Sequence, residues 1–179
     1  SFNSIFDTEL RFNDQWKLSS QVGIQWDQSS QEQYVGENTF NMRNIREDSS
    51  YGENQYIVPK GGMHTVNNAT TSQITWKVQG EYKNTFNDIH DIQIMAGSEI
   101  RKNWYNTQFT AGYGYDPKTL TTKPLNIRND KDAEKYKLHT KTYQENAFAS
   151  FYTTGSYSFM SRYTIGGSVR MDGSDLFGV

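Results

Sequence analysis

The stretch that decides the fold is ENAFASFYTTGSYSFMSRYTIGGSVRMDGSDLFG, which runs from Glu145 to Gly178. It predicts a strand from Asn146 to Tyr157, a tight turn over residues 158–162 and a return strand from Tyr163 to about Asp172. Successive side chains of a strand point to opposite faces. One face of the return strand therefore carries Tyr163, Ile165, Gly167, Val169 and Met171, and the other carries Thr164, Gly166, Ser168, Arg170 and Asp172. The pattern predicts one apolar face and one polar face.

Two earlier segments repeat this plan. The first predicted hairpin joins residues 6–12 to residues 16–27 through a turn at residues 13–15. The second joins residues 73–82 to residues 92–101. Between Trp16 and Asp27, five of six positions on one face are apolar and none of the six on the other face is. The sequence therefore predicts an all-β protein with about six antiparallel strands in three hairpins.

The composition suits a membrane barrel better than a soluble core. Hydrophobic residues make up 34% of the chain and aromatic residues 15%, and the mean hydropathy is −0.85. A soluble domain with so little aliphatic content would struggle to fill a core, whereas a transmembrane β-barrel needs only every second strand residue to be apolar. No window approaches the roughly 18 consecutive apolar residues of a membrane-spanning helix, so any spanning must use strands.

Aromatic positions fit the two interfaces of such a barrel. Trp16 and Trp26 lie ten residues apart on the apolar face. At about 3.3 Å per residue and a tilt near 40°, this separation is roughly 25 Å, the height of an outer-membrane barrel's apolar band. We expect Trp76 to lie level with Trp26 at the long-loop end and Tyr82 to lie near the short-turn end. The alternative for this hairpin is a pair of core tryptophans in a soluble sandwich.

Two long segments lose the alternation, from Gln28 to about Thr71 and from Lys102 to Gln144. They contain all three prolines of the chain, at positions 59, 117 and 124, and proline breaks the hydrogen-bond ladder of a strand. We expect both segments to be irregular loops, including the charged run from Arg128 to Lys137, for which a short helix is the alternative. Short turns that alternate with long loops are typical of outer-membrane barrels, whose turns are periplasmic and whose loops are extracellular.

The C-terminal hairpin also carries a more specific signature. The residues that form it are Asn146, Phe148, Ala149, Ser150 and Phe151 on the first strand and Arg170, Asp172, Gly173, Ser174, Phe177 and Gly178 on the second. This pattern resembles the barrel of SusC/RagA-type TonB-dependent outer-membrane transporters. Asp175 stands where that family more often has a second serine, and Thr153 or Thr154 replaces the usual arginine. The signature spans about a fifth of the chain.

The resemblance implies a bacterial outer-membrane protein of a Gram-negative cell that imports a bulky nutrient, an oligosaccharide fragment or a peptide. It also implies coupling to the TonB complex through a plug domain, a SusD-like surface lipoprotein as a lid, and contact with membrane lipid. Because six strands cannot close a barrel whose smallest known forms have about eight, and the chain starts at Ser1, we expect residues 1–179 to be a partial transmembrane β-barrel domain of a longer chain that also holds the plug. The alternatives are a passive porin or structural barrel, and a soluble β-rich binding module or adhesin.

Residue patterns for catalysis, metal binding or nucleic-acid binding are missing from the sequence. There is no cysteine, and the three histidines lack ligand spacing. A net charge of −2 without a basic cluster argues against nucleic acid. No base, nucleophile and orienting group occur together, so we expect no enzyme and no cofactor.

The best candidates for binding substrate or a partner are aromatic residues of the second irregular segment, because aromatic rings offer flat apolar surface to sugars and to partner side chains. The candidate residues are Trp104, Tyr105, Asn106, Tyr113, Tyr115 and Arg128. The alternative is that these rings pack the loop or extend the aromatic girdle, which applies most to Trp104.

Overall fold

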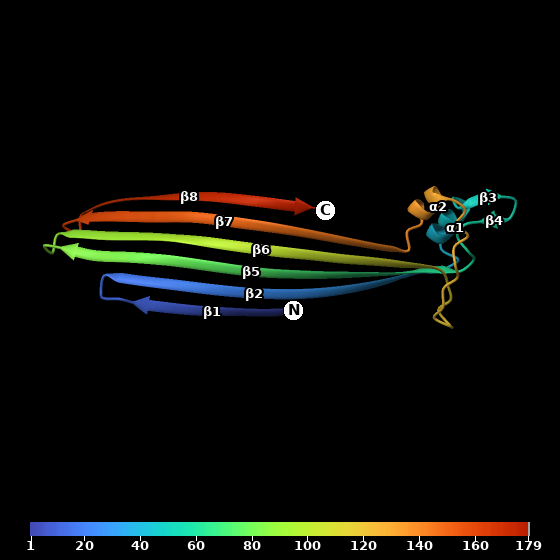
Figure 1. Ribbon diagram of the computed structural model, residues 1–179, viewed down its shortest axis with the longest axis horizontal. Helices are drawn as coiled ribbons and strands as arrows, with labels where there is room; N and C mark the ends of the chain where they lie inside the picture. Colours follow the sequence, from blue (N-terminus) through green and yellow to red (C-terminus); the bar gives the residue numbers. More distant parts are fainter. Residues whose placement is uncertain (179) are drawn as a thin grey trace. The chain divides into compact units, whose positions relative to one another are not determined.

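The computed structural model describes residues 1–178, with side chains as far as Asp175. Its main element is a six-stranded antiparallel sheet with the strand order β1-β2-β5-β6-β7-β8 (Figure 1). The strands are β1 (Phe2–Arg11), β2 (Trp16–Val35), β5 (Gly62–Phe86), β6 (His90–Tyr115), β7 (His139–Phe159) and β8 (Tyr163–Gly178). A second, two-stranded sheet joins β3 (Ser50–Gly52) to β4 (Gln55–Tyr56), and the helices are α1 (Phe40–Glu47) and α2 (Asp130–Lys135). The predicted three hairpins and six strands are confirmed.

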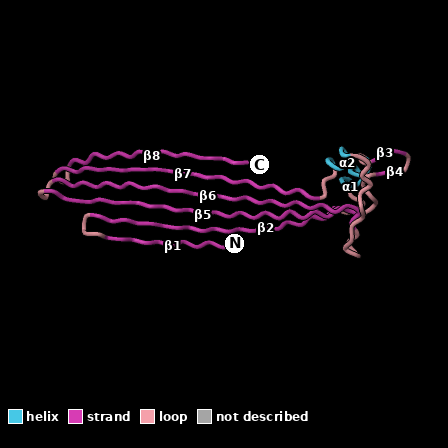
Figure 2. Tube along the Cα trace, viewed as in Figure 1, coloured by secondary structure: helices cyan, strands magenta, loops and turns pink. Residues whose placement is uncertain are grey.

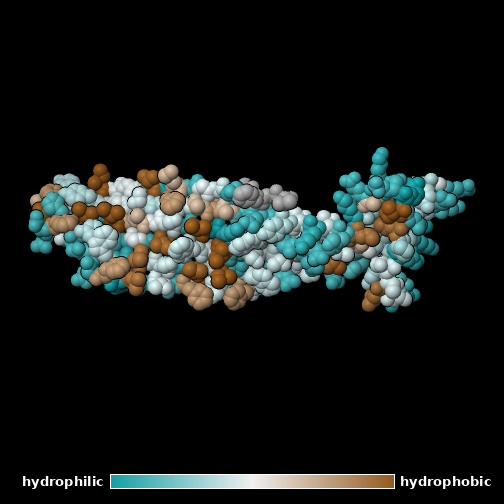
Figure 3. Space-filling view, in the orientation of Figure 1, coloured by the Kyte–Doolittle hydropathy of each residue, from teal (hydrophilic) through white to brown (hydrophobic). Residues whose placement is uncertain are grey.

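Strand pairing confirms the predicted faces. Phe6 lies opposite Val22 in the β1–β2 pair, and Met171 lies opposite Phe151 in the β7–β8 pair. The apolar side chains of this face are uncovered: Val169 is 62% exposed and Met171 71%. Figure 3 shows such side chains reaching the surface over the strands. Because an uncovered apolar sheet face is unfavourable in water, it indicates contact with an apolar medium.

The three hairpin turns are short, as predicted. The Asn13 side-chain oxygen accepts hydrogen bonds from the backbone amides of Gln15 and Trp16, at 2.9 and 2.8 Å. The β5–β6 turn places Asn87 and Asp88 in the left-handed region, with φ of 50° and 55°, as the favoured two-residue hairpin turns require. These turns allow the flanking strands to pair up to their ends.

The strands are longer than predicted, and this corrects both irregular segments. β2 continues to Val35, β5 begins at Gly62, β6 continues to Tyr115 and β7 begins at His139. Residues 28–34 of β2 are exposed on both faces. Apolar and polar side chains alternate along a strand only where one face is shielded from water. Where water reaches both faces, a strand can be polar throughout while its backbone hydrogen bonds still form. Periodicity therefore marks only the part of each strand that has an apolar face.

The chain forms two compact units. Unit 1 contains residues 1–27, 70–105 and the chain from residue 143 onward, and unit 2 contains residues 28–69 and 106–142. Unit 2 has a small core of Met42, Ile57, Val58 and Tyr136, against which Val35, Ile45, Met63, Tyr113 and Leu125 pack. Figure 2 shows both helices among the loops of this unit. Neither helix in the described part of the chain is long and apolar enough to cross a membrane.

Helix α2 corrects the interpretation of the charged run as a loop. The Asn129 side chain accepts the amide of Asp132 at 2.9 Å and so caps the first turn. Asp130 and Asp132 lie in the first turn and Lys135 in the last, where acidic and basic groups are each favoured by the helix dipole. The capping signal was present in the sequence, but the helix is too short for a periodic apolar stripe.

The predicted position of Tyr82 near the short-turn end is confirmed, whereas the predicted position of Trp76, level with Trp26 at the long-loop end, is wrong. Tyr82 packs against Trp16 beside the short turn, with ring centroids 4.7 Å apart. Trp76, however, donates from its indole nitrogen to the Ser20 hydroxyl at 3.1 Å, so it is not level with Trp26. The sequence pattern fixes the face of a residue but not the stagger between strands of different hairpins.

We predict that a fragment of residues 1–179 will not behave as a soluble monomer. Among the described residues, β1 pairs with β2 alone and β8 with β7 alone, so each leaves a row of free backbone groups on its other edge. Size-exclusion chromatography without detergent should show aggregates. A monodisperse monomer with a cooperative melt would instead favour the soluble binding module.

Candidate functional site

The polar face of unit 1 is organised around Tyr152 on β7. A methyl group at position 97 on β6 would lie 2.5 Å from the Tyr152 hydroxyl oxygen, so Gly97 leaves the space that the ring occupies. The hydroxyl donates to Gln79 Oε1 on β5 at 3.1 Å. One side chain therefore connects three strands across the polar face.

Two cations face the Tyr152 ring. Lys77 Nζ lies 5.9 Å from the ring centroid and the Arg170 guanidinium carbon 6.0 Å. Arg170 is the cross-strand partner of Tyr152; its Nε donates to Asp172 at 2.8 Å and its Nη2 to the Ser150 hydroxyl at 3.1 Å. The signature residues Ser150, Arg170 and Asp172, which come from two strands, thus form one polar network.

A second network lies nearer the short turns. Lys17 Nζ lies 3.2 Å from Glu81 and 3.7 Å from Glu9. Gln79 donates to Glu81 at 2.7 Å, and Arg11 pairs with Glu9 at 2.7 Å. Because these groups are partly exposed, each pair contributes little stability. Their effect is a wettable surface with balanced charge.

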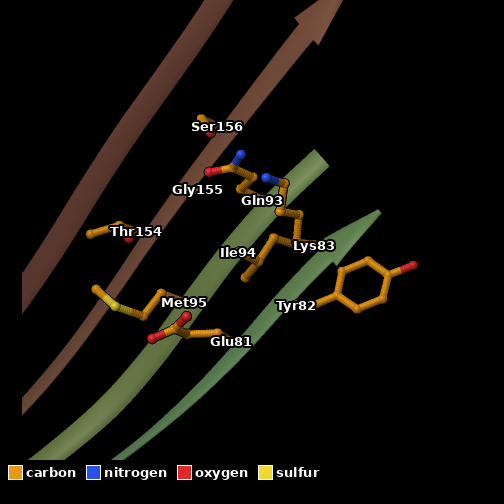
Figure 4. A pocket seen from close by; sticks show the side chains of 9 residues that line it. All are labelled: Glu81, Tyr82, Lys83, Gln93, Ile94, Met95, Thr154, Gly155 and Ser156. Carbon is orange, nitrogen blue, oxygen red and sulfur yellow. The ribbon is translucent and has the colours of Figure 1, made fainter. Parts of the chain in front are cut away.

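A hollow of about 350 Å³ opens on this face between β5, β6 and β7. Figure 4 shows Glu81 and Met95 close together, while the Tyr82 ring points away from both. The polar lining residues are Glu81, Lys83, Gln93, Thr154 and Ser156. The carboxylate, ammonium, amide and hydroxyl groups of this lining can form hydrogen bonds with water or a polar solute.

Five of the six predicted binding residues lie on a strand rather than in a loop, which corrects the sequence interpretation. Trp104 and Tyr105 lie on β6 in unit 1, and Asn106, Tyr113 and Tyr115 lie on β6 in unit 2. Arg128 precedes α2 in unit 2. The structure does not gather all six into one site.

Trp104 belongs to a polar-aromatic cluster at the end of the apolar face of β6. Lys102 Nζ lies 5.3 Å from the Trp104 ring and forms an ion pair with Glu145. The Tyr143 hydroxyl donates to Glu145 at 2.9 Å. Charged groups and aromatic rings next to an apolar band are typical of a membrane interface, so this cluster supports a girdle position for Trp104.

Tyr113 and Arg128 make packing contacts within unit 2. The Tyr113 ring meets Tyr136 edge-on at 6.2 Å. Burial, with a smaller effect from Tyr136, raises the pKa of Tyr113. Arg128 lies 3.9 Å over the Tyr51 ring and pairs with Asp132 at 3.0 Å. These contacts support the packing alternative, and a binding role for either residue stays a prediction.

Tyr115 lies in an aromatic group that the sequence analysis did not identify. It stacks on His64 with centroids 4.9 Å apart and meets Tyr34 at 5.6 Å. His64 Nε2 lies 3.6 Å from Glu32. Tyr34 and His64 come from β2 and β5, and only the strand register brings them to Tyr115. Within the described residues, no group of three or more potential metal ligands occurs.

Comparison with known proteins finds solved structures with a similar fold and one distantly related curated protein. No protein-family model matches the chain. The TonB-dependent receptor P39 of Formosa agariphila is 30% identical over 99 residues, which are 54% of this chain and 9% of that protein. The structure of the RagAB peptide transporter matches 96% of this chain and 17% of the solved chain, with a TM-score of 0.71 and 17% identity. The RagAB peptide importer in its open-open state matches with the same TM-score and 18% identity.

The chain resembles the barrel of SusC/RagA-type transporters. It spans 9% of the curated relative's length and 17% of each solved chain. At 17–18% identity the solved structures show the fold alone, and this likeness covers 96% of the chain.

In this SusC/RagA-like sheet, we predict that Gly97→Ala destabilises the protein by about 1–3 kcal/mol. The added methyl group would lie 2.5 Å from the Tyr152 hydroxyl oxygen and 2.8 Å from the backbone oxygen of Val78, so both must shift. Gly167→Ala on β8 is the matched control, since a methyl group there meets nothing within 4 Å. Thermal unfolding of the full-length protein in detergent measures both. Equal melting temperatures of the two variants would contradict the prediction, because they would show that Tyr152 and the Val78 backbone shift without cost.

For Tyr113 we predict a loss of packing. Tyr113→Ala should lower the free energy of unfolding by about 2 kcal/mol, less than the ~3–5 kcal/mol of a fully buried aromatic ring. Tyr113→Phe should keep the packing. Because folding raises the pKa of Tyr113, its neutral form contributes stability below the unfolded pKa of about 10, and this contribution is lost as pH rises through the higher folded value. Alkaline melts of the wild type that match those of Tyr113→Phe would contradict this.

Proposed function

We propose that this chain forms six strands of the barrel wall of a TonB-dependent transporter in the outer membrane of a Gram-negative bacterium. The transporter imports bulky nutrients, glycan fragments or peptides. Residues 1–179 supply part of the transmembrane barrel domain, and the remaining strands and the plug belong to the rest of the polypeptide. The short turns face the periplasm and unit 2 carries the extracellular loops.

The observation that carries this proposal is the different chemistry of the two faces of unit 1. One face is apolar and uncovered and includes Val169 and Met171, and the other carries the Tyr152 network and the Lys17 ion pairs. A soluble sandwich would cover the apolar face with a second sheet. A barrel wall places lipid on that face and the polar lumen on the other.

The energy source and partners are proposed from the same likeness. The TonB complex acts through the plug, and a SusD-like lipoprotein covers the extracellular opening. Two similar structures are described as a RagAB peptide transporter and a RagAB peptide importer, and the curated relative is named a TonB-dependent receptor. These names support TonB-driven uptake and a peptide as one candidate substrate. Uptake of labelled peptides and oligosaccharides by cells with and without TonB tests the coupling, and TonB-independent uptake would favour a passive porin.

Substitutions of two neighbouring residues test which face of the sheet meets lipid. Val22 shares the apolar face with Phe6, whereas Gln21 donates to Asp7 at 2.7 Å on the polar face. Val22→Arg should cost roughly 2–4 kcal/mol because it places a charge in lipid. Gln21→Arg should be tolerated.

The measurement is heat-modifiable gel mobility of the full-length protein in outer-membrane fractions, which reports the folded barrel. We expect folded barrel to be depleted in Val22→Arg and retained in Gln21→Arg. Equal effects of the two substitutions would refute a lipid-facing position for Val22.

A further inference from the structure

Unit 2 contains a hollow of about 320 Å³ where the ends of β2 and β6 meet the segment that leads into β5. Three glycines line it and fix its shape. Gly61 and Gly114 have φ of 141° and 62°, and a methyl group at Gly61 would lie 2.6 Å from the Gly114 backbone. A methyl group at Gly62 would lie 2.7 Å from the Tyr34 ring. Because these segments approach too closely for any larger residue, the hollow is a built feature of the unit.

Two tyrosine rings line the same hollow, Tyr34 from β2 and Tyr115 from β6. Their centroids lie 5.6 Å apart, with the ring planes at 59°. Tyr115 is stacked on His64, and Tyr34 remains 47% exposed although its ring contacts the Gly62 backbone position. Rings that are held by their neighbours and still reach solvent offer a ligand a flat apolar surface.

Charged side chains surround these rings. Of the five charged residues that line the hollow, Lys60, Lys118 and Lys123 are cations. Lys60 lies 3.7 Å from Glu37, whereas Lys118 and Lys123 form no ion pair among the described residues. Lys123 Nζ donates to the Lys60 carbonyl at 3.1 Å and keeps two further donors.

Both carboxylates of the lining already have partners. Glu37 faces Lys60, and Asp116 Oδ1 accepts the backbone amide of Lys118 at 2.9 Å. The ammonium groups of Lys118 and Lys123 are therefore the charges that a ligand can use. Each favours an anionic group, and together they can hold one through charge-assisted hydrogen bonds.

We propose that this hollow binds an acidic sugar, a residue of a glycan that carries a carboxylate or a sulfate group. The flat C–H face of the sugar ring packs on a tyrosine ring, and the anionic group pairs with Lys118 and Lys123. At about 320 Å³ the hollow lies at the lower end of the range for ligand sites, so it holds a short part of the glycan. The inference rests on the proposed function and narrows its substrate to charged glycans.

The test measures the affinity of the full-length transporter in detergent for defined tetrasaccharides by calorimetry. Tetragalacturonate carries carboxylates, its methyl ester is the same chain without charge, and a sulfated galactose tetrasaccharide carries sulfates. We expect an acidic probe to bind at least about tenfold more tightly than the ester, because hydrogen bonds to a charged group are the stronger ones. The preference between the two acidic probes identifies the anionic group.

Lysine variants locate the charge. Lys118→Gln combined with Lys123→Gln should weaken binding of the acidic probe about tenfold and reduce its salt dependence, while binding of the ester stays the same. The matched control is Lys131→Gln combined with Lys137→Gln. It removes the same charge from exposed positions of unit 2 outside the hollow and should change neither affinity.

Tyrosine variants test the stacking surface. Tyr34→Ala should weaken binding of the acidic probe and of the ester alike, because contact with the ring does not depend on charge. Tyr34→Phe keeps the ring and should retain most of both affinities. Melting temperatures are measured for every variant. Should Tyr34→Ala lower the melting temperature, the lysine variants decide alone.

Equal affinity for the acidic probes and the ester, or an equal loss in the control lysine pair, would overturn the acidic-sugar site. A glutamate tetrapeptide that binds more tightly than the sugars through the same lysines would assign the hollow to acidic peptides and also overturn it. These results would leave TonB-driven uptake of other nutrients, and hence the proposed function, intact. TonB-independent uptake in the cell assay would instead overturn the proposed transporter and leave the binding result as it stands.

Discussion

The structure depends on backbone hydrogen bonding between strands that have one uncovered apolar face. A strand beside an apolar medium must satisfy its amides and carbonyls through its neighbours, because no water is available to do so. The antiparallel ladder of β1, β2, β5, β6, β7 and β8 meets this condition for every interior strand. The separation of the sheet into an apolar and a polar face, the tight turns and the exclusion of proline from the strands follow from the same condition. All three prolines of the chain lie outside the strands.

The polar face shows how such a sheet can specify its register as well as its pairing. Hydrophobic alternation distinguishes the two faces but tolerates a slip of two residues. The contact of Tyr152 with Gly97, and its hydrogen bond to Gln79, fits one register across three strands. Arg170 extends this arrangement to β8 through its cross-strand pairing with Tyr152 and its bond to Ser150. These contacts explain part of the sequence signature of the C-terminal hairpin, because its residues Ser150, Arg170 and Asp172 form the polar network that joins this hairpin to the sheet.

The sequence could predict those features of the fold that neighbouring residues determine, and not those that depend on contacts between distant segments. The hairpins and the two faces were predictable because alternation is a local consequence of one apolar face. The strand extension through residues 28–35 was not, because a strand that is exposed on both faces carries no period. In the extension through residues 102–115, Ala111 is buried and Tyr113 packs against the core of unit 2, but these contacts depend on distant segments and leave no regular period. Tyr34 and His64 could not be linked to Tyr115 without the register, and the placement of Trp76 failed for the same reason. The capped helix α2 was signalled by Asn129 and Asp132, but six residues offer little else to recognise.

Unit 2 differs from a set of free loops because it has a core of its own. Met42 and Val58 are almost completely buried, α1 is capped by the Thr39 hydroxyl, and the Ser49 hydroxyl accepts the Val58 amide at 3.2 Å. Such contacts fix the backbone at the cost of conformational entropy during folding, so that entropy need not be lost again when a partner binds. A flexible loop needs a large interface to offset its own ordering, whereas a rigid one can bind through few side chains. The small core of unit 2 therefore gives its surface the rigidity that binding through few side chains requires.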